Sequence, residues 1–437
     1  MNMINVRRLA AMTFLGAGML SDISAQDFSL QADTLNEARL PAQWDLQSCI
    51  DYALEQNITI RKNRVTAEST QIDVKTAKAA LFPSLSFSTS QQVVNRPYQE
   101  TSSRVSGSEI ISSNSKTSYN GNYGLNASWT IYNGSKRLKT LKQERLNNQV
   151  AELDVATSEN TIKESIAQIY IQILYAAESV RVNENTLQVS IAQRDRGQEL
   201  LNAGSIAKSD FAQLEAQVST DRYQLVTAQA TLQDYKLQLK QLLELDGENE
   251  MNVYLPKLSD ENVLAPLPAK KDVYVSALAI RPEIEASKLN VEASELGIDI
   301  AKSSYFPTIS LSAGIGTNHT SGSDFTFGEQ VKNGWNNSIG LSVSVPIFNN
   351  RQTKSAVQKA KLQRETDMLS LLDEQKALYK TIESLWLDAN SAQQRYAAAN
   401  EKLRSTQISY DLISEQFNLG MKNTVELLTE KNNLLQA

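Results

Sequence analysis

The sequence predicts a mainly α-helical protein that also carries a membrane β-barrel. Three observations lead to this fold class. The chain of 437 residues contains one pattern of segments twice. Each copy has long stretches without proline in which apolar residues recur at helical spacing. Each copy also has two segments in which apolar and polar residues alternate, the pattern of strands with two different faces.

Residues 1–25 are expected to be a signal peptide. Arg7 and Arg8 precede the apolar run LAAMTFLGAGML, and a stretch ending in the small residue Ala25 follows it. A basic region, an apolar region and a small-residue cleavage site in this order are typical of secretory signals. A membrane anchor is the alternative, but it needs about 20 apolar residues to span a bilayer and this run is shorter. Gln26, rather than a cysteine, follows the expected cleavage site, so no lipid attachment is predicted there.

The composition argues against several classes of function. With 43 basic and 49 acidic residues the net charge is −6, and no basic block suggests binding to nucleic acid. The chain has one cysteine, Cys49, and one histidine, His319 in a polar loop segment. We therefore expect no intrachain disulfide, no metal site of the usual Cys/His types and no cofactor. No phosphate-binding loop or nucleophile motif is present, so an enzyme is not expected.

The duplication is visible in three pairs of matching segments. The segments AKAALFPSLSFS and AKSSYFPTISLS place Pro83 and Pro307 at equivalent positions, with an offset of 224 (307 − 83). Two later pairs, TIYNGSKR with PIFNNRQT and the segments around Gly204 and Gly420, share an offset of 216 (420 − 204). Each repeat is predicted to run helix, strand, loop, strand, long helix, glycine turn, helix.

These matches divide the chain. The first repeat covers residues 26–245, and the second covers 273–437. Between them, residues 246–272 form a connector (the equatorial region) rich in Asp, Asn, Glu and Pro. Because the second repeat ends where the first continues for several helical turns, we expect the C-terminus to be clipped.

Four strands are predicted, at about 84–94, 119–132, 308–317 and 335–347. They are longer than the usual 5–6 residues of globular sheets and match the roughly 9–11 residues of a tilted membrane strand. A soluble sandwich is the alternative, but its strands would be joined by short turns, whereas the connections at about 95–118 and 318–334 are long. Six aromatic residues are expected to face lipid or form the interfacial girdles: Tyr119, Tyr123, Trp129, Tyr132, Trp335 and Phe348.

Four strands cannot close a membrane barrel, because the smallest such barrels have about eight. Several copies of the chain must therefore contribute, and closed symmetry allows two, three or four of them. The sequence pattern alone leaves this number open.

The helices are predicted to be unusually long. No proline occurs between Ser135 and Asn202, and a helix of that length would extend about 100 Å. One apolar stripe consists of Ile162, Ile166, Ile169 and Ile173. A second stripe, between Phe211 and Leu242, alternates steps of three and four residues, with Asp221 as its one polar member. Such spacing predicts coiled-coil packing, with antiparallel hairpins that turn at Gly204 and Gly420.

The signal peptide, the duplication, the alternating strands and the long helical hairpins together resemble the TolC-type outer-membrane efflux proteins. Local marks of the resemblance are AKAALFPSLS, AKSSYFPTIS, SVPIFNNR, LLNAGSIAKSDFAQLEAQ and FNLGMKNTVELLTEK. The resemblance implies a homotrimer whose twelve strands form one barrel in the outer membrane lipid, with a coiled-coil tunnel extending into the periplasm. It also implies a passive exit duct that docks a periplasmic adaptor protein and an inner-membrane pump.

The resemblance further implies roles for residues at the periplasmic tip. Gly204 and Gly420 match the tip-turn glycines where the adaptor docks, although a plain helix C-cap explains a glycine equally well. Asp210 and Lys422 match a pair whose salt link helps to hold the tunnel shut.

Glu426 matches an acidic residue that lines the constriction, where three copies would form a cation-attracting ring. The second acid of the family pattern is replaced by Thr429, with Glu430 one position later, so a single ring is expected. A solvated helix face is the alternative for each of these charges.

Two other functions stay open at this stage. A periplasmic or secreted coiled-coil spacer would account for the helices but not for the alternating strands. A stand-alone porin would account for the strands but not for helices of about 100 Å. The sequence does not indicate whether drugs, metals or proteins are exported.

Overall fold

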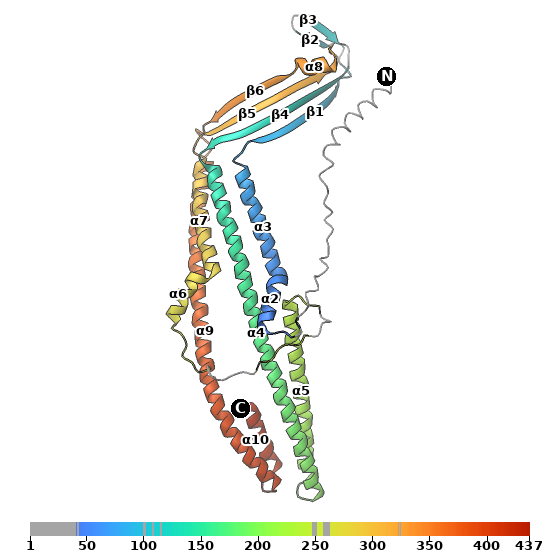
Figure 1. Ribbon diagram of the computed structural model, residues 1–437, viewed down its shortest axis with the longest axis vertical. Helices are drawn as coiled ribbons and strands as arrows, with labels where there is room; N and C mark the ends of the chain where they lie inside the picture. The colour runs from blue at the N-terminus through green and yellow to red at the C-terminus, as the bar shows by residue number, and fades with distance from the viewer. Residues whose placement is uncertain are drawn as a thin grey trace.

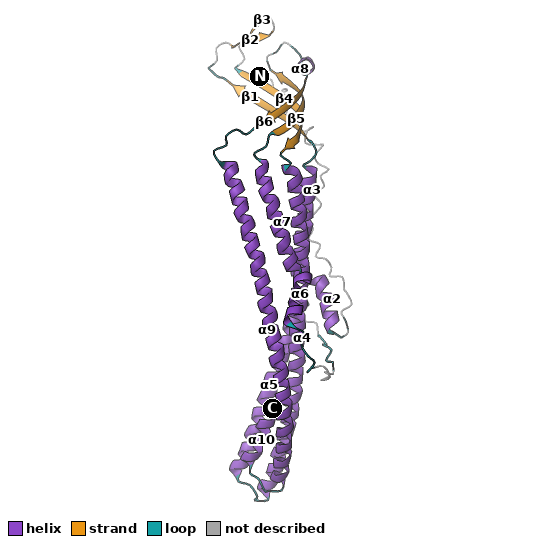
Figure 2. Ribbon diagram, turned by 90° about the vertical axis from the view of Figure 1, so that its left-hand side faces the viewer, coloured by secondary structure: helices purple, strands orange, loops and turns teal. Residues whose placement is uncertain are grey.

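The computed structural model describes residues 41, 43–98, 102–106, 109–113, 116–246, 251–256, 263–321, 323 and 325–437. The predicted signal peptide and part of the predicted connector lie outside these residues. The molecule is elongated, with a β-sheet at one end and two helical hairpins at the other (Figure 1). Figure 2 shows the long helices running side by side below the sheet.

The elements follow the order that the repeats predict, with additions in the connections. The first repeat contains α2 (Leu46–Gln56), α3 (Ile58–Ala79), β1 (Ser84–Asn95), β2 (Ser102–Ser106), β3 (Glu109–Ser113), β4 (Thr117–Asn133), α4 (Lys136–Asn202) and α5 (Lys208–Leu242). The second contains α6 (Lys270–Ile280), α7 (Pro282–Ser303), β5 (Thr308–Thr320), α8 (Phe327–Asn333), β6 (Asn336–Ser344), α9 (Gln352–Asn418) and α10 (Thr424–Gln436).

The two halves of the structure repeat each other closely. Helices α3 and α7 are both 22 residues long, and their first residues differ by 224 positions (282 − 58). Helices α4 and α9 are both 67 residues long, and their first residues differ by 216 positions (352 − 136). Even the junction before each long helix is repeated, since Ser135 and Arg351 both have a positive φ, of 62° and 65°. The same offsets as in the sequence therefore recur in the backbone.

The strands β1, β4, β5 and β6 form one antiparallel sheet in the order β1-β4-β5-β6. The hairpins of the two repeats meet at its centre, where β4 pairs with β5. In the described part of the chain, β1 and β6 each pair on one side only, so both edges of the sheet are open. An open edge is a row of backbone donors and acceptors available to another strand.

The pairing gives this sheet one apolar and one polar face. On one face, a row across all four strands consists of Leu85, Ala127, Ala313 and Ile339. On the other face, the neighbouring row consists of Ser84, Ser128, Ser312 and Gly340. The Ser84 and Ser128 hydroxyls are hydrogen-bonded at 2.8 Å. None of the four strands contains Asp, Glu, Lys or Arg.

Several features of the strand region differ from the prediction. Strand β6 ends at Ser344 rather than near 347, because Pro346 lacks the N–H that a ladder needs. The connection predicted as an irregular loop at 318–334 contains α8, which begins with a capping box between Thr326 and Glu329. The other connection contains the short hairpin β2–β3.

The apolar stripes of the helices form the core where α2, α4 and α5 meet. Ile166 and Ile173 of the predicted α4 stripe are fully buried, and so is Leu239 of the α5 stripe. The start of the first repeat and the connector that follows it meet at this core, since Trp44 forms a bridge with Val253. In the part of the chain that the structure describes, no helix is both long and apolar enough to cross a membrane.

Cys49 lies in this core and is fully buried. Burial raises the pKa of its thiol to about 12, with a smaller contribution from the nearby Asp45 carboxylate. A raised pKa favours the neutral thiol, which is the unreactive form. We expect no labelling of the folded protein by a maleimide at pH 8 and one labelled thiol per chain in denaturant. Rapid labelling of the folded protein would contradict this packing.

Candidate functional site

The turns that end the two hairpins have the same backbone geometry. Gly204 and Gly420 have φ values of 74° and 75°, a region that side chains with a Cβ rarely adopt. At the first turn, Ser205 N donates to Leu200 O at 2.8 Å and Gly204 N donates to Leu201 O at 3.0 Å. The second turn repeats this pattern of a Schellman helix end. Both glycines are therefore required by the backbone, and a Cβ at either position would meet nothing within 4 Å.

The predicted gating acids have a local role in the helices that follow these turns. Asp210 and Glu426 are equivalent in the two repeats, since they differ by 216 positions (426 − 210). The Glu426 carboxylate accepts from the backbone N–H of Asn423 at 3.2 Å, while the Asn423 side chain accepts from the N–H of Glu426. Asp210 accepts from the N–H of Ala207 at 3.3 Å. Each acid thus caps the N-terminus of its helix.

Within one chain, Lys422 forms a salt bridge with Glu426 rather than with Asp210. The distance from Lys422 Nζ to Glu426 Oε1 is 2.5 Å. This hydrogen bond, with the one from Asn423 N–H, holds the pKa of Glu426 below its usual value. Between described residues of this chain no Asp210–Lys422 salt bridge occurs, and their salt link stays a prediction.

The predicted girdle residues lie at both ends of the sheet. Trp129 lies near the end of the sheet that joins the helices, where its Nε1 donates to Leu81 O at 2.9 Å. Tyr132 is out of phase with Trp129 in the sequence, but a bulge between Thr130 and Tyr132 places it opposite Ile309. Trp335 and Phe348 flank β6 and are exposed.

Tyr119 and Tyr123 lie at the far end of the sheet with His319. The sequence placed His319 in a polar loop, and this was wrong, because β5 extends to Thr320. The imidazole lies opposite Gly121, with ring centroids 5.1 Å from Tyr119, 5.9 Å from Tyr123 and 5.0 Å from Phe327 of α8. The alternation of Ile315, Thr317 and His319 could have revealed the longer strand.

A cluster that the sequence did not reveal connects the two hairpins. Lys431 of α10 forms a salt bridge with Asp221 of α5, and both also bond to Ser190 of α4. A second hydrogen bond also joins the hairpins, since Gln193 Nε2 of α4 donates to the Tyr410 hydroxyl of α9 at 2.9 Å. Burial raises the pKa of this tyrosine. The one sequence signal for the cluster was Asp221, the polar member of an apolar stripe.

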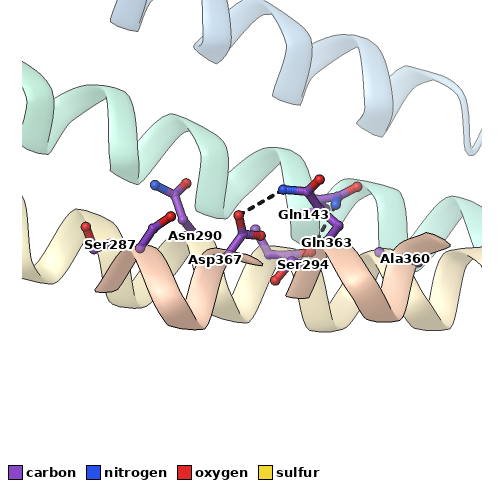
Figure 3. A pocket seen from close by; sticks show the side chains of 10 residues that line it. Gln143, Ser287, Asn290, Ser294, Ala360, Gln363 and Asp367 are labelled. Atoms are coloured by element: carbon purple, nitrogen blue, oxygen red, sulfur yellow. Dashed lines mark hydrogen bonds between the residues drawn. The ribbon is translucent and has the colours of Figure 1, made fainter. Parts of the chain in front are cut away.

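A polar pocket lies where α7 and α9 pack beside α4 (Figure 3). Its polar groups bond to each other, since Gln363 Nε2 donates to Asp367 Oδ1 at 2.9 Å and Gln143 Nε2 donates to Ala293 O at 3.0 Å. Among the described residues, no group of three His, Cys, Asp or Glu side chains is arranged to hold a metal ion.

Two named outer membrane proteins are similar in sequence to large parts of this chain. It is 26% identical over 279 residues to the outer membrane efflux protein BepC of Brucella suis, covering 63% of this chain and 58% of BepC. It is 24% identical over 327 residues to the outer membrane protein TolC of Escherichia coli, covering 72% of this chain and 64% of TolC. The chain therefore spans less than two thirds of the length of these relatives.

The fold is similar to that of CusC, which has been studied for folding and transmembrane channel formation. The TM-score is 0.75 at 19% identity, and the match covers 90% of this chain and 86% of CusC. The model of the outer membrane efflux protein family matches residues 49–244 and 273–437, which cover most of both repeats. This chain belongs to the outer membrane efflux protein family.

Proposed function

We propose that this protein is the outer-membrane exit duct of a tripartite efflux or type I secretion system. The observation that carries the proposal is the sheet, which has an uncharged apolar face, a small polar face and two open edges. The apolar face suits lipid, and the polar face suits a water-filled lumen. Members of its family are channels and not enzymes.

Three chains would close the barrel. The open edge of β6 pairs with β1 of the next chain, and repetition of this heterologous contact produces a ring. Three sheets of four strands supply the twelve strands that the resemblance implies. The same symmetry arranges the long helices as a tunnel on the periplasmic side, with the turns at Gly204 and Gly420 at its tip.

The turns are the proposed docking site for the periplasmic adaptor. Both glycines leave open space around Cα, so a helical tip of another protein can approach the backbone closely. Leu419 and Met421 beside Gly420 are exposed and offer apolar contact. The duct itself is passive, and the inner-membrane pump supplies the energy and selects the cargo.

The first test of this function is ion conduction. The purified full-length protein, reconstituted in a planar bilayer, should form channels that conduct ions without an added energy source. Pores should be absent from bilayers treated with detergent alone. A protein that inserts as a trimer but never conducts ions would contradict the duct.

Replacing Glu426 with Gln is expected to lower the preference of the channel for cations. Three copies of this acid form one ring in the proposed trimer, and the Lys422 hydrogen bond keeps each carboxylate ionised to a lower pH than usual. The measurement is the reversal potential in a KCl gradient. Glu401→Gln, which removes the same charge from an exposed site on α9, is the control. An equal reversal potential for the wild type and Glu426→Gln would remove the ring from the proposal.

A further inference from the structure

The ends of four helices that lie nearest the sheet carry an excess of positive charge. The last eight residues of α3 and α7 and the first eight of α4 and α9 are 72–79, 296–303, 136–143 and 352–359. We call these four segments the basic collar. Together they contain nine basic and two acidic residues, a net charge of +7 (9 − 2), whereas the rest of the chain carries −13 (−6 − 7).

The collar is a narrow band. The next eight residues of the same helices, 64–71, 144–151, 288–295 and 360–367, contain five basic and six acidic residues, a net charge of −1 (5 − 6). Eight helical residues extend about 12 Å. On the other side of the collar, none of the four strands of the sheet contains a charged residue. The positive charge is therefore confined to the level where the sheet meets the helices (Figure 2).

Most cations of the collar have no acid beside them. Six lysines of the collar are exposed and form no salt bridge with a described residue: Lys75, Lys78, Lys136, Lys142, Lys354 and Lys359. Lys139 and Lys302 do pair with an acid, but they share one, Asp299. The collar is thus available to an anion from outside the chain.

Helix stability does not account for the collar. The N-terminus of a helix carries a partial positive charge, so cations in the first turn are unfavourable. Nevertheless α4 and α9 have Lys136 and Lys354 in their first turns, with no acidic residue there and no side-chain cap. These lysines therefore oppose the helices that carry them.

The two repeats keep the positive charge but not the positions of the cations. Within the collar, Lys78 and Lys302 are the one pair of basic residues at equivalent positions (302 − 78 = 224). A packing contact or a gate would need particular positions. Attraction to a diffuse anionic surface depends mainly on the total charge.

Apolar side chains mark the boundary between the sheet and the collar. Tyr305 and Phe306, which join α7 to β5, are both exposed. Leu138 of α4 is also exposed, and it lies one turn before Lys142 on the same face of the helix. Trp129 belongs to the apolar face of the sheet and lies at this level. Exposed aromatic residues with lysines just beyond them are typical of a membrane–water interface.

We propose that the basic collar binds the phosphate headgroups of anionic phospholipids in the leaflet on the helical side of the sheet. This rests on the proposed function, because it requires the apolar face of the sheet to lie in lipid. Each cation close to an anionic membrane surface adds to the attraction. In the proposed trimer the collar carries +21 (3 × 7). The collar thereby fixes the depth at which the duct sits in the membrane.

The test uses Trp129 as a reporter of the lipids beside the collar. The chain has four tryptophans. Trp44 is buried in the core beside α2, and Trp386 donates to Pro268 O beside α6, so both lie away from the sheet (Figure 1). Trp335 precedes β6 at the opposite end of the sheet, and Trp335→Phe removes it. Trp129 is then the one tryptophan within reach of a lipid quencher.

The full-length Trp335→Phe protein is reconstituted in vesicles of equal parts phosphatidylglycerol and phosphatidylcholine. Two sets of vesicles are compared, with bromine on the acyl chains of one lipid or of the other. Brominated phosphatidylglycerol should quench Trp129 severalfold more than brominated phosphatidylcholine does. This quenching ratio should approach one in about 1 M NaCl, because the screening length is then about 3 Å.

Two variants in the same background locate the charges that cause the preference. The collar variant carries Lys136→Gln, Lys142→Gln, Lys354→Gln and Lys359→Gln. The control variant loses the same charge from exposed sites outside the collar, through Lys208→Gln, Lys376→Gln, Lys380→Gln and Arg404→Gln. The quenching ratio should fall to near one in the collar variant and stay unchanged in the control.

The results separate failure of the collar from failure of the proposed function. Equal quenching by the two lipids at low salt would overturn the collar while leaving the sheet in the membrane, and this result needs no collar variant to assemble. No quenching by either lipid would remove the sheet from the membrane, and with it the proposed function and the collar. A collar variant that keeps the quenching ratio but shifts the reversal potential would place these lysines in the lumen and would also overturn the proposal.

Discussion

Replacing Ile339 with Arg is expected to prevent assembly of the membrane trimer. Ile339 is 83% exposed on the apolar face of β6, in the row with Ala313 and Ala127. An arginine on the lipid side near the middle of a barrel costs about 2–4 kcal/mol. Three copies enter each trimer, so the total cost is comparable to the whole stability of many domains.

The matched control is Ser338→Arg. Ser338 is the neighbouring residue of the same strand and lies on the polar face, where its hydroxyl donates to Gly314 O. This arginine would point into water, and assembly should proceed. The measurement is the fraction of each variant that is recovered as trimer from the outer membrane. Equal recovery of both variants would mean that the apolar face does not contact lipid.

The second large effect is expected from the core beside the equatorial region. Ile166 of α4 is 0% exposed and packs in the cluster that contains Trp44 and Cys49. Ile166→Ala should lower the free energy of unfolding by about 3 kcal/mol, because the removed atoms leave a cavity. Denaturant titration followed by circular dichroism measures this change.

Ile166→Val is the graded control. It removes one methylene from the same position and should cost about 1 kcal/mol. An alanine variant that is no less stable than the valine variant would show that the position is not tightly packed. The core would then not be the element that holds α2 and α5 against α4.

The helices and strands were predictable because their patterns are local and repeated. Alternation over the stretch 119–132 follows from the two-sided geometry of a strand, and the structure extends this strand only to Thr117–Asn133. The turns at Gly204 and Gly420 were readable because few residues other than glycine adopt a positive φ at a helix end. The duplication supported each of these assignments with an independent second copy.

The features that escaped prediction depend on contacts between distant residues. No local pattern indicates that Lys431 reaches Asp221, which is 210 positions away. The same charge on Glu426 fits a helix cap, a salt bridge to Lys422 and a ring in a trimer, and only the first two involve one chain.

The end of β6 was misjudged for a local reason. The apolar residues Val345 and Ile347 continue the alternation past the strand, across Pro346.

The most direct test of the trimeric barrel is the mass of the native protein. Cells are fractionated, the envelope is extracted in mild detergent, and the protein mass is measured by light scattering with the detergent contribution subtracted. A mass of three chains in the outer-membrane fraction is the predicted result. A monomer or dimer released with the periplasmic contents would contradict the account, because the apolar face and both open edges of the sheet would then have no lipid and no partner strand.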